Sequence, residues 1–462
     1  MPLSKLKFNP GINRDRTDLA AMGGWYDGNM IRFRDGYPEK LGGWQAETFT
    51  PYVGEATKLF VYSVDTGAEI AGLATTKKIY VRAGTTLFDI TPIRVTYTTS
   101  TTPSTDNCFT TNTTAGTEGQ VLVTITGHGA ETGDFVTFSG AVAVGGITAV
   151  QLNLNFEVTV TGANTFTIQT AGTATGVATG GGTSITAAFE INIGADSSVG
   201  GYGWGAGTWS RGVWGGASVT PAIINVRLVF MDHFNNDLVF NLNDEGPIYY
   251  WTYNATFSNR AVLLSSLPGA IAVPTGTEKT LFAPSGHLLA LGATEYSETS
   301  TAGITIAGLV SVGTTATATT ATAHGLATND WVYLYGQTPT AYSGTYQITV
   351  ASTTTFTYTL PASAGTVTAV GAYQAIDYTA GDYDPMLIRF ADVNADIGPK
   401  PEVWRPELAN SAGFLFVKEG SRIITGTNVR QETLIWTDTS LSTLQFLGTA
   451  EVFGLQLLSS DT

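Results

Sequence analysis

The strongest constraint on the fold is a recurring run of short apolar strands separated by tight polar turns. It occurs in residues 58–91, 225–252 and 413–438, and a split copy occupies 280–293 and 386–392. The unsplit copies end on aromatic-rich strands with a polar stop, LFDIT, IYYWT and LIWTD. Short hairpin-linked strands that recur in this way indicate the blades of a β-propeller. The chain is therefore predicted to be mainly β, with a propeller-like body.

The last residues, EVFGLQLLSSDT at 451–462, read as the opening strand of a further unit that has no closing strand. This predicts a body that is incomplete at its C-terminal end and is closed by further chain or by another segment. Thr, Ala, Val and Gly dominate the sequence, and long stretches of good helix formers are missing, which also favours β structure.

Two stretches free of Lys and Arg interrupt this body and repeat one another. GHGAETGDFV begins at Gly127 and AHGLATNDWV begins at Ala323, with a constant offset of 196 from His128 to Gly140. After six extra residues in the first copy, FEVTV matches YQITV and TFTI matches TFTY. Both stretches are predicted to be small homologous β-domains inserted into surface loops.

These patterns divide the chain into six segments. We predict an N-terminal docking arm at 1–45, a first body part at 46–94, a first insert at 95–199, a second body part with a Gly/Trp-rich loop at 200–300, a second insert at 301–375 and a third body part at 376–462.

Charge is distributed unevenly along the chain. The net charge is −15, and no Lys or Arg occurs between Arg94 and Arg211 or between Lys279 and Arg389. The first 45 residues differ, with seven Lys and Arg against five Asp and Glu. The acidic body argues against a tight grip on nucleic acid. The basic arm is either a solvated terminus or an element that docks on an acidic neighbour.

The single cysteine, Cys108, excludes an internal disulfide and fits assembly in a reducing cytoplasm. The first residues lack the apolar core of a signal peptide. No apolar run approaches the roughly 18 residues that a membrane-spanning helix needs. The sequence therefore predicts no membrane-spanning segment.

The repeated His phrase is interpreted as a turn. Its shared residues are His128, Gly129, Asp134, His324, Gly325 and Asp330. The glycines allow positive φ, the aspartates can accept from backbone N–H groups, and the histidines are expected to hydrogen-bond across the turn. A metal site would need more ligands. A nucleophilic site would need a shared Ser or Cys, whereas Ser139 becomes Tyr335 in the second copy. No catalytic, metal or cofactor-binding residue is predicted, and no cofactor.

The stretch GGYGWGAGTWSRGVWGG at 200–216 places Trp204, Trp209 and Trp214 five residues apart among glycines. It is either a loop attached to the body by buried indoles or an aromatic contact surface for a neighbouring subunit or a glycan. The acidic pair Asp382 and Asp384 is interpreted as turn residues, because a glycosidase needs two carboxylates that converge in a cleft.

Several short motifs carry a family resemblance. They are PGI at 10–12, NMIRF at 29–33, GYPEKLGGW at 36–44, the Gly/Trp stretch at 200–216 and TLIWTD at 433–438. In this order they resemble the nozzle or tail-hub proteins of short-tailed bacteriophages, also called tail tubular protein B or packaged-DNA stabilisation proteins. The resemblance covers the body of the chain.

The resemblance implies a virion protein of the phage tail, assembled in the host cytoplasm and without enzymatic activity. Such proteins form a homohexameric ring below the portal and adaptor, with a β-propeller that carries inserts. They continue the DNA channel, retain the genome and contact tail fibres or spikes. The expected partners are copies of the chain, the adaptor, fibres or spikes, and double-stranded DNA that passes without sequence-specific binding. The expected assembly or docking residues are Arg14, Arg16, Trp25, Arg32, Arg34 and Trp44.

Two other interpretations stay open. Repeated β-inserts with aromatic loops also suit a receptor- or glycan-binding module of a fibre or adhesin. A polysaccharide depolymerase on a propeller scaffold is the third, with Asp382 and Asp384 as its candidate carboxylates.

Overall fold

The computed structural model describes residues 9–12, 14, 17, 23–43, 51–194, 228–242, 245–254, 256–394, 398–407, 410–449 and 451–460. Within these residues it contains strands β1 to β35, one α-helix of four residues and two short 3-10 turns. The prediction of a mainly β fold is confirmed. None of the described helices is long and apolar enough to cross a bilayer.

Residues 1–51 form a unit of their own. In it, β1 (Ile31–Arg34) and β2 (Tyr37–Lys40) pair as an antiparallel hairpin. The connecting residues Asp35 and Gly36 both have positive φ, 52° and 85°. An Asp-Gly pair with positive φ at both positions is the turn that matches the twist of the two strands.

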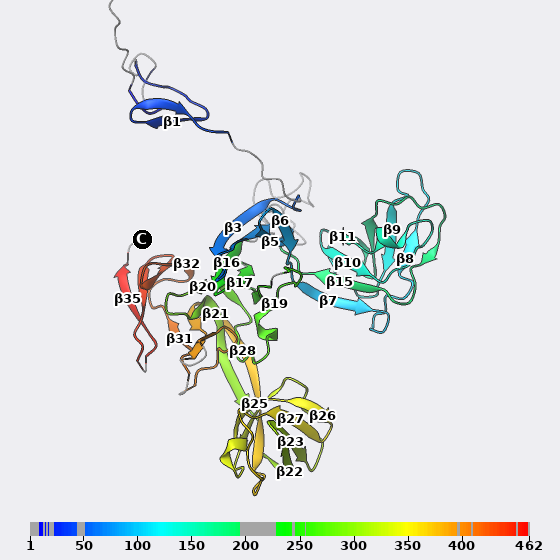
Figure 1. The fold of residues 1–462 in the computed structure, drawn as a ribbon, viewed down its shortest axis with the longest axis vertical. Helices are drawn as coiled ribbons and strands as arrows, with labels where there is room; N and C mark the ends of the chain where they lie inside the picture. The colour runs from blue at the N-terminus through cyan, green and yellow to red at the C-terminus, as the bar shows by residue number, and fades with distance from the viewer. Residues whose placement is uncertain are drawn as a thin grey trace, which may run out of the picture. The chain divides into compact units, whose positions relative to one another are not determined.

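Residues 52–462 form the second unit, whose body is built on four antiparallel sheets; Figure 1 labels some of their strands. Sheet 1 contains β3 (Ala56–Ser63), β4 (Glu69–Thr75), β5 (Ile79–Ala83) and β6 (Thr86–Asp89). Sheet 2 contains β16 (Val229–Phe234), β17 (Asp237–Leu242), β18 (Ile248–Trp251) and β19 (Val262–Leu263). Sheet 3 contains β20 (Thr277–Phe282), β21 (Leu288–Ser300), β28 (Ala372–Phe390) and β31 (Gly413–Phe416), and it continues through β28 into the strands of the second insert as one ten-stranded sheet. Sheet 4 contains β32 (Ile423–Asn428), β33 (Glu432–Thr437), β34 (Leu441–Phe446) and β35 (Phe453–Ser459). In the chain, the 3-10 turn η1 (Leu264–Ser266) follows β19, and the hairpin of β29 (Asp392–Asn394) and β30 (Gly398–Lys400) lies between β28 and β31.

The four sheets pack face to face in chain order through three hydrophobic cores. These cores contain Val81 and Phe240 between sheets 1 and 2, Val239 and Leu288 between sheets 2 and 3, and Ile388 and Ile435 between sheets 3 and 4. Val239 and Phe240 are adjacent and point to opposite faces, so sheet 2 is buried on both sides. Successive propeller blades pack in the same manner. Closure of these sheets into a ring stays a prediction.

Two details of the predicted units are wrong. β35 does not open a fifth unit, because it pairs with β34 as the last strand of sheet 4. β31, expected in one unit with residues 433–438, pairs with β28 of sheet 3 instead. Alternation along a strand determines which side chains face a core, but it does not determine which strand is the neighbour.

The first insert follows β6 in the chain and is a sandwich of two sheets, ordered β11-β10-β15-β7 and β12-β13-β9-β8-β14. Its core includes Phe138, Phe166 and Phe189. Its elements are β7 (Ile93–Thr98), β8 (Phe109–Thr111), β9 (Gln120–Thr124), β10 (Phe135–Ser139), α1 (Ala149–Leu152), β11 (Asn155–Glu157), β12 (Thr159–Gly162), β13 (Thr165–Gln169), β14 (Thr179–Gly180) and β15 (Thr186–Glu190).

The second insert lies between β21 and β28, which run as a long antiparallel ribbon from sheet 3 into the insert (Figure 1). Its elements are β22 (Ile304–Val312), β23 (Thr315–Thr320), β24 (Trp331–Tyr335), η2 (Thr340–Tyr342), β25 (Gly344–Gln347), β26 (Thr349–Ser352) and β27 (Thr355–Thr359). β24 starts 196 residues after β10, and β27 starts 190 residues after β13. The six extra residues of the first copy therefore fall between these strands, where α1 occupies the place of η2.

Candidate functional site

The His turn is built in the same way in both inserts. In the first, Nδ1 of His128 accepts from the N–H of Ala130 at 3.0 Å, and Nε2 lies 3.2 Å from the carbonyl oxygen of Gly162. His324 makes the equivalent two contacts at 3.0 and 2.9 Å. Because Nδ1 accepts, the ring proton belongs on Nε2, where it is donated to the carbonyl. Both ring nitrogens are thus engaged by the backbone.

The aspartates and glycines complete these turns. Asp134 and Asp330 each accept from the backbone N–H three residues earlier, at 2.9 and 2.8 Å. Gly129 and Gly325 have φ of 58° and 69°, a region that favours glycine. The geometry is that of a structural turn used twice. Among the described residues, no group of three or more His, Cys, Asp or Glu could hold a metal ion.

The described arm residues are paired within the N-terminal unit. Arg14 lies 2.7 Å from Asp27, and the Gly28 N–H together with Arg14 lowers the pKa of that carboxyl. Arg32 lies 3.0 Å from Glu39 across the hairpin. Both pairs are largely exposed to solvent, where an ion pair contributes little stability.

Arg34 is exposed, and Trp25 packs edge-on against Phe33 with ring centroids 6.2 Å apart. The predicted residues Arg16, Trp44, Trp204, Trp209 and Trp214 lie outside the described residues.

The acidic pair on β28 is not arranged as a catalytic dyad in a cleft. Asp384 accepts from the backbone N–H of Met386 at 2.7 Å, so its carboxylate supports an irregularity of the strand. Asp382 is exposed.

Exposed apolar side chains lie on the outer faces of the two end sheets. On β3, Leu59 and Val61 are 62% and 57% exposed, whereas the alternating Tyr62 is buried against sheet 2. Leu59 and Val61 therefore lie on the face of sheet 1 that points away from sheet 2. On sheet 4, Ile435 is buried against sheet 3, and its neighbours Leu434 and Trp436 are half-buried on the opposite face.

A groove of about 750 Å³ runs along the edge strands β31 and β35. Phe414 and Phe416 line it, half-exposed, with ring centroids 6.0 Å apart. Leu457 lines it from β35. Each strand has a single sheet neighbour among the described residues, β28 for β31 and β34 for β35. An apolar groove between two unpaired strand edges is a surface on which another chain can pack.

A buried charge cluster joins the first insert to the body. Lys78, 3% exposed, lies 2.7 Å from Asp89 of sheet 1 and 3.0 Å from Glu190 of the insert, which is 1% exposed. Its Nζ also donates to Asn155 of the insert at 2.9 Å. Arg260 approaches the same two carboxylates at 2.8 and 3.1 Å. Burial is the main cause that raises the pKa of Glu190. The ion pairs and hydrogen bonds of this cluster connect strands of the body to strands of the first insert at their junction.

A second ion pair lies at the base of the second insert. Arg405 binds both carboxylate oxygens of Glu298 on β21, at 2.9 Å each, and its Nη1 lies 3.3 Å from the hydroxyl of Thr345 in the insert. Paired N–H···O bonds of this kind fix orientation as well as distance.

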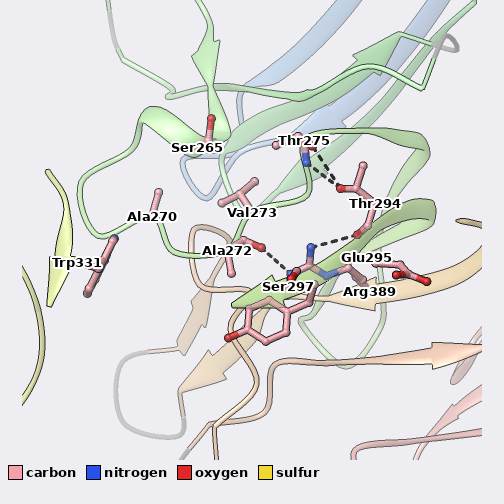
Figure 2. A pocket seen from close by; sticks show the side chains of 11 residues that line it. Ser265, Ala270, Ala272, Val273, Thr275, Thr294, Glu295, Ser297, Trp331 and Arg389 are labelled. Atoms are coloured by element: carbon pink, nitrogen blue, oxygen red, sulfur yellow. Dashed lines mark hydrogen bonds between the residues drawn. The ribbon is translucent and has the colours of Figure 1, made fainter. Parts of the chain in front are cut away.

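Near this ion pair is a hollow of about 230 Å³ beside Arg389 (Figure 2). It is lined by β21 residues, by the segment from Ser265 to Thr275 and by Trp331 of the second insert. Arg389 is 2% exposed.

The charge cluster, the Glu298 pair and this hollow were not predicted from the sequence. Lys78 and Glu190 are 112 residues apart, and Glu298 and Arg405 are 107 apart, so no local pattern connects them. The one sequence feature that could have drawn attention to the hollow is the position of Arg389 at the end of a long stretch without Lys or Arg.

Comparisons with known proteins give no family. No family model matches the chain, and no curated protein matches it. Among solved structures, phage phi92 endosialidase matches with a TM-score of 0.17 and 12% sequence identity, over 88% of this chain and 73% of that chain. A TM-score of this size does not show a common fold.

Proposed function

We propose that this chain is a structural subunit of a bacteriophage tail, a nozzle or hub protein that assembles into a ring below the portal and adaptor. The observation that carries the proposal is the stack of four sheets whose two end faces and open edges expose apolar side chains. Leu59 and Val61 on the outer face of sheet 1, and Phe414 and Phe416 on the open edge strand β31 of sheet 3, are the surfaces of a subunit that packs against neighbours. The N-terminal motifs that resemble tail-hub proteins support the same function.

Identical subunits that meet through two different surfaces build a closed ring when the rotation between them closes. The outer face of sheet 1 and the exposed surface of sheets 3 and 4 are two such different surfaces. A homohexamer is the ring order that the resemblance implies. The basic arm, with Arg34 exposed, is proposed to dock on the adaptor or on the next subunit.

The acidic net charge of the chain is consistent with the proposal that the ring forms a channel through which DNA moves. Each phosphate that a protein neutralises adds a salt-sensitive attraction, which would slow a DNA molecule in transit. A net charge of −15 and two inserts without Lys or Arg avoid such attraction. In this proposal the ring continues the DNA channel, retains the genome until ejection and carries tail fibres or spikes.

The assembly surface is tested first with purified full-length chain. Analytical ultracentrifugation is expected to show a ring-sized oligomer, and Leu59→Glu with Val61→Glu is expected to shift it to monomers, because a buried unpaired charge is unfavourable. The control is Val150→Glu on α1, a position that is already 79% exposed. If the double variant assembles like the unmodified chain, the outer face of sheet 1 is not the interface.

Location is tested on intact phage particles by immunogold electron microscopy with antibody against residues 127–170. Label at the distal end of a short tail is the expected result. Label along fibres would favour the receptor- or glycan-binding alternative. Particles without label, with the protein free in the lysate, would refute a virion role and reopen the depolymerase alternative.

A further inference from the structure

Among the described residues, two basic side chains are almost fully buried, and they differ in whether a carboxylate lies near them. Lys78 has two carboxylates within 3.0 Å. Arg389 has none within 4.0 Å among the described residues. A cation taken out of water without a counter-charge is unfavourable, so an unpaired buried arginine requires an explanation.

Backbone carbonyls supply part of the explanation. The guanidinium of Arg389 donates to the carbonyl oxygens of Thr294, Ala272 and Trp404, at 3.3, 2.5 and 3.2 Å. Two of these bonds are drawn in Figure 2. They hold the side chain in place, yet an arginine has five N–H donors, and carbonyl dipoles leave its full positive charge uncancelled. Burial lowers the pKa of Arg389 to about 10, which is the direction expected for a cation without a partner.

Arg389 also lines a hollow. Figure 2 shows Trp331 across this hollow from Arg389, and Ser265 and Ser297 are among the other residues that line it. The ring of Tyr296 lies 5.7 Å from the guanidinium carbon. A volume of about 230 Å³ holds several waters at roughly 30 Å³ each, which is room for a small molecule.

We propose that this hollow binds a small organic carboxylate, whose negative charge pairs with Arg389 and whose nonpolar or ring portion packs between Trp331 and Tyr296. Arginine is the side chain best matched to a carboxylate. Aromatic and hydroxyl walls suit a sugar ring, so an acidic sugar and a simple carboxylic acid are the two sources of this group. The proposal is independent of the tail assignment.

One neighbour opposes an anion at this place. Glu295 lines the hollow from β21 and is exposed, and it makes no ion pair with Arg389. Its charge weakens binding of a carboxylate from the solvent side. Removing that charge with Glu295→Gln is therefore expected to tighten binding, which gives a variant that improves the site without touching Arg389.

The experiment titrates the full chain with glucuronate, acetate and glucose by isothermal calorimetry. Binding of glucuronate alone assigns an acidic sugar, and binding of both acids assigns a general carboxylate site. Glucose that binds as well as glucuronate, or no binding of either acid, overturns the proposal.

Variants separate the site from folding. Arg389→Gln is expected to raise Kd roughly tenfold or more, the loss of one charge-assisted hydrogen bond. Because Arg389 also donates to three backbone carbonyls, this variant can misfold. Glu295→Gln therefore provides an independent test of the site. Its Kd is expected to decrease two- to fivefold, roughly the effect of one exposed charge. Arg430→Gln, at an exposed arginine that does not line the hollow, is the matched control and should bind like the unmodified chain. Unchanged binding in Glu295→Gln refutes the site, and unchanged binding in a folded Arg389→Gln variant refutes it as well.

Discussion

Replacing Lys78 with methionine tests the charge cluster that joins the first insert to the body. Lys78→Met keeps the approximate length of the side chain and removes its charge. Among the described residues, Arg260, at 3.1 Å, then remains as the oppositely charged partner of the buried Glu190. Breaking a buried pair by removing one partner costs about 3–5 kcal/mol. Because Arg260 stays in place, we expect a cost at the lower end of this range, about 3 kcal/mol. This cost corresponds to a roughly 100-fold increase in the equilibrium constant for opening of the first insert.

Cys108 reports this opening. It is the single cysteine, it lies in the core of the first insert, and burial raises the pKa of its thiol to about 12. A thiol reagent therefore labels it only when the insert opens. Lys78→Met should be labelled roughly 100-fold faster than the unmodified chain.

Two variants control this result. Lys77→Met removes a neighbouring pair with Glu157 that is partly solvated, and it should cost less than about 1 kcal/mol. Lys78→Met with Glu190→Gln removes both buried charges and should recover much of the loss. Equal labelling of Lys78→Met and Lys77→Met would refute the reasoning, because burial would then have no effect on the cost of an unpaired charge.

Two further predictions concern histidines. His287 is buried between Ser285 and Ser411, and burial lowers its pKa from 6.5 to about 4. The unfolded state therefore binds the additional proton between these values. The contribution of His287 to stability should be constant well above pH 6.5 and fall by about 3 kcal/mol as the pH drops to 4. Urea titrations of the unmodified chain and of His287→Phe at several pH values should differ by this slope. His128→Ala removes the acceptor of the Ala130 N–H and should destabilise the first insert by about 1–3 kcal/mol. Faster labelling of Cys108 measures this, whereas His324→Ala, the same change in the second insert, should leave Cys108 labelling unchanged.

Local patterns predicted the parts of this molecule that depend on near neighbours. Alternation and turn residues specify strands and hairpins, so the mainly β class follows from the sequence. The offsets of 196 and 190 that relate the two copies of the repeat reappear as the starts of β10, β24, β13 and β27. The His turns also belong here, because their histidine and aspartate side chains accept from backbone N–H groups two or three residues away.

Strand pairing and the buried charges depended on tertiary structure. β31 and β35 have sequences that fit either of two units, and only packing placed them in sheets 3 and 4. Lys78 and Arg389 are both basic residues, but folding brings two carboxylates to one and a hollow to the other. The physical reason is range: hydrogen bonds of a turn and the alternation of a strand are settled within a few residues, whereas burial and charge pairing depend on which distant segments the chain brings together.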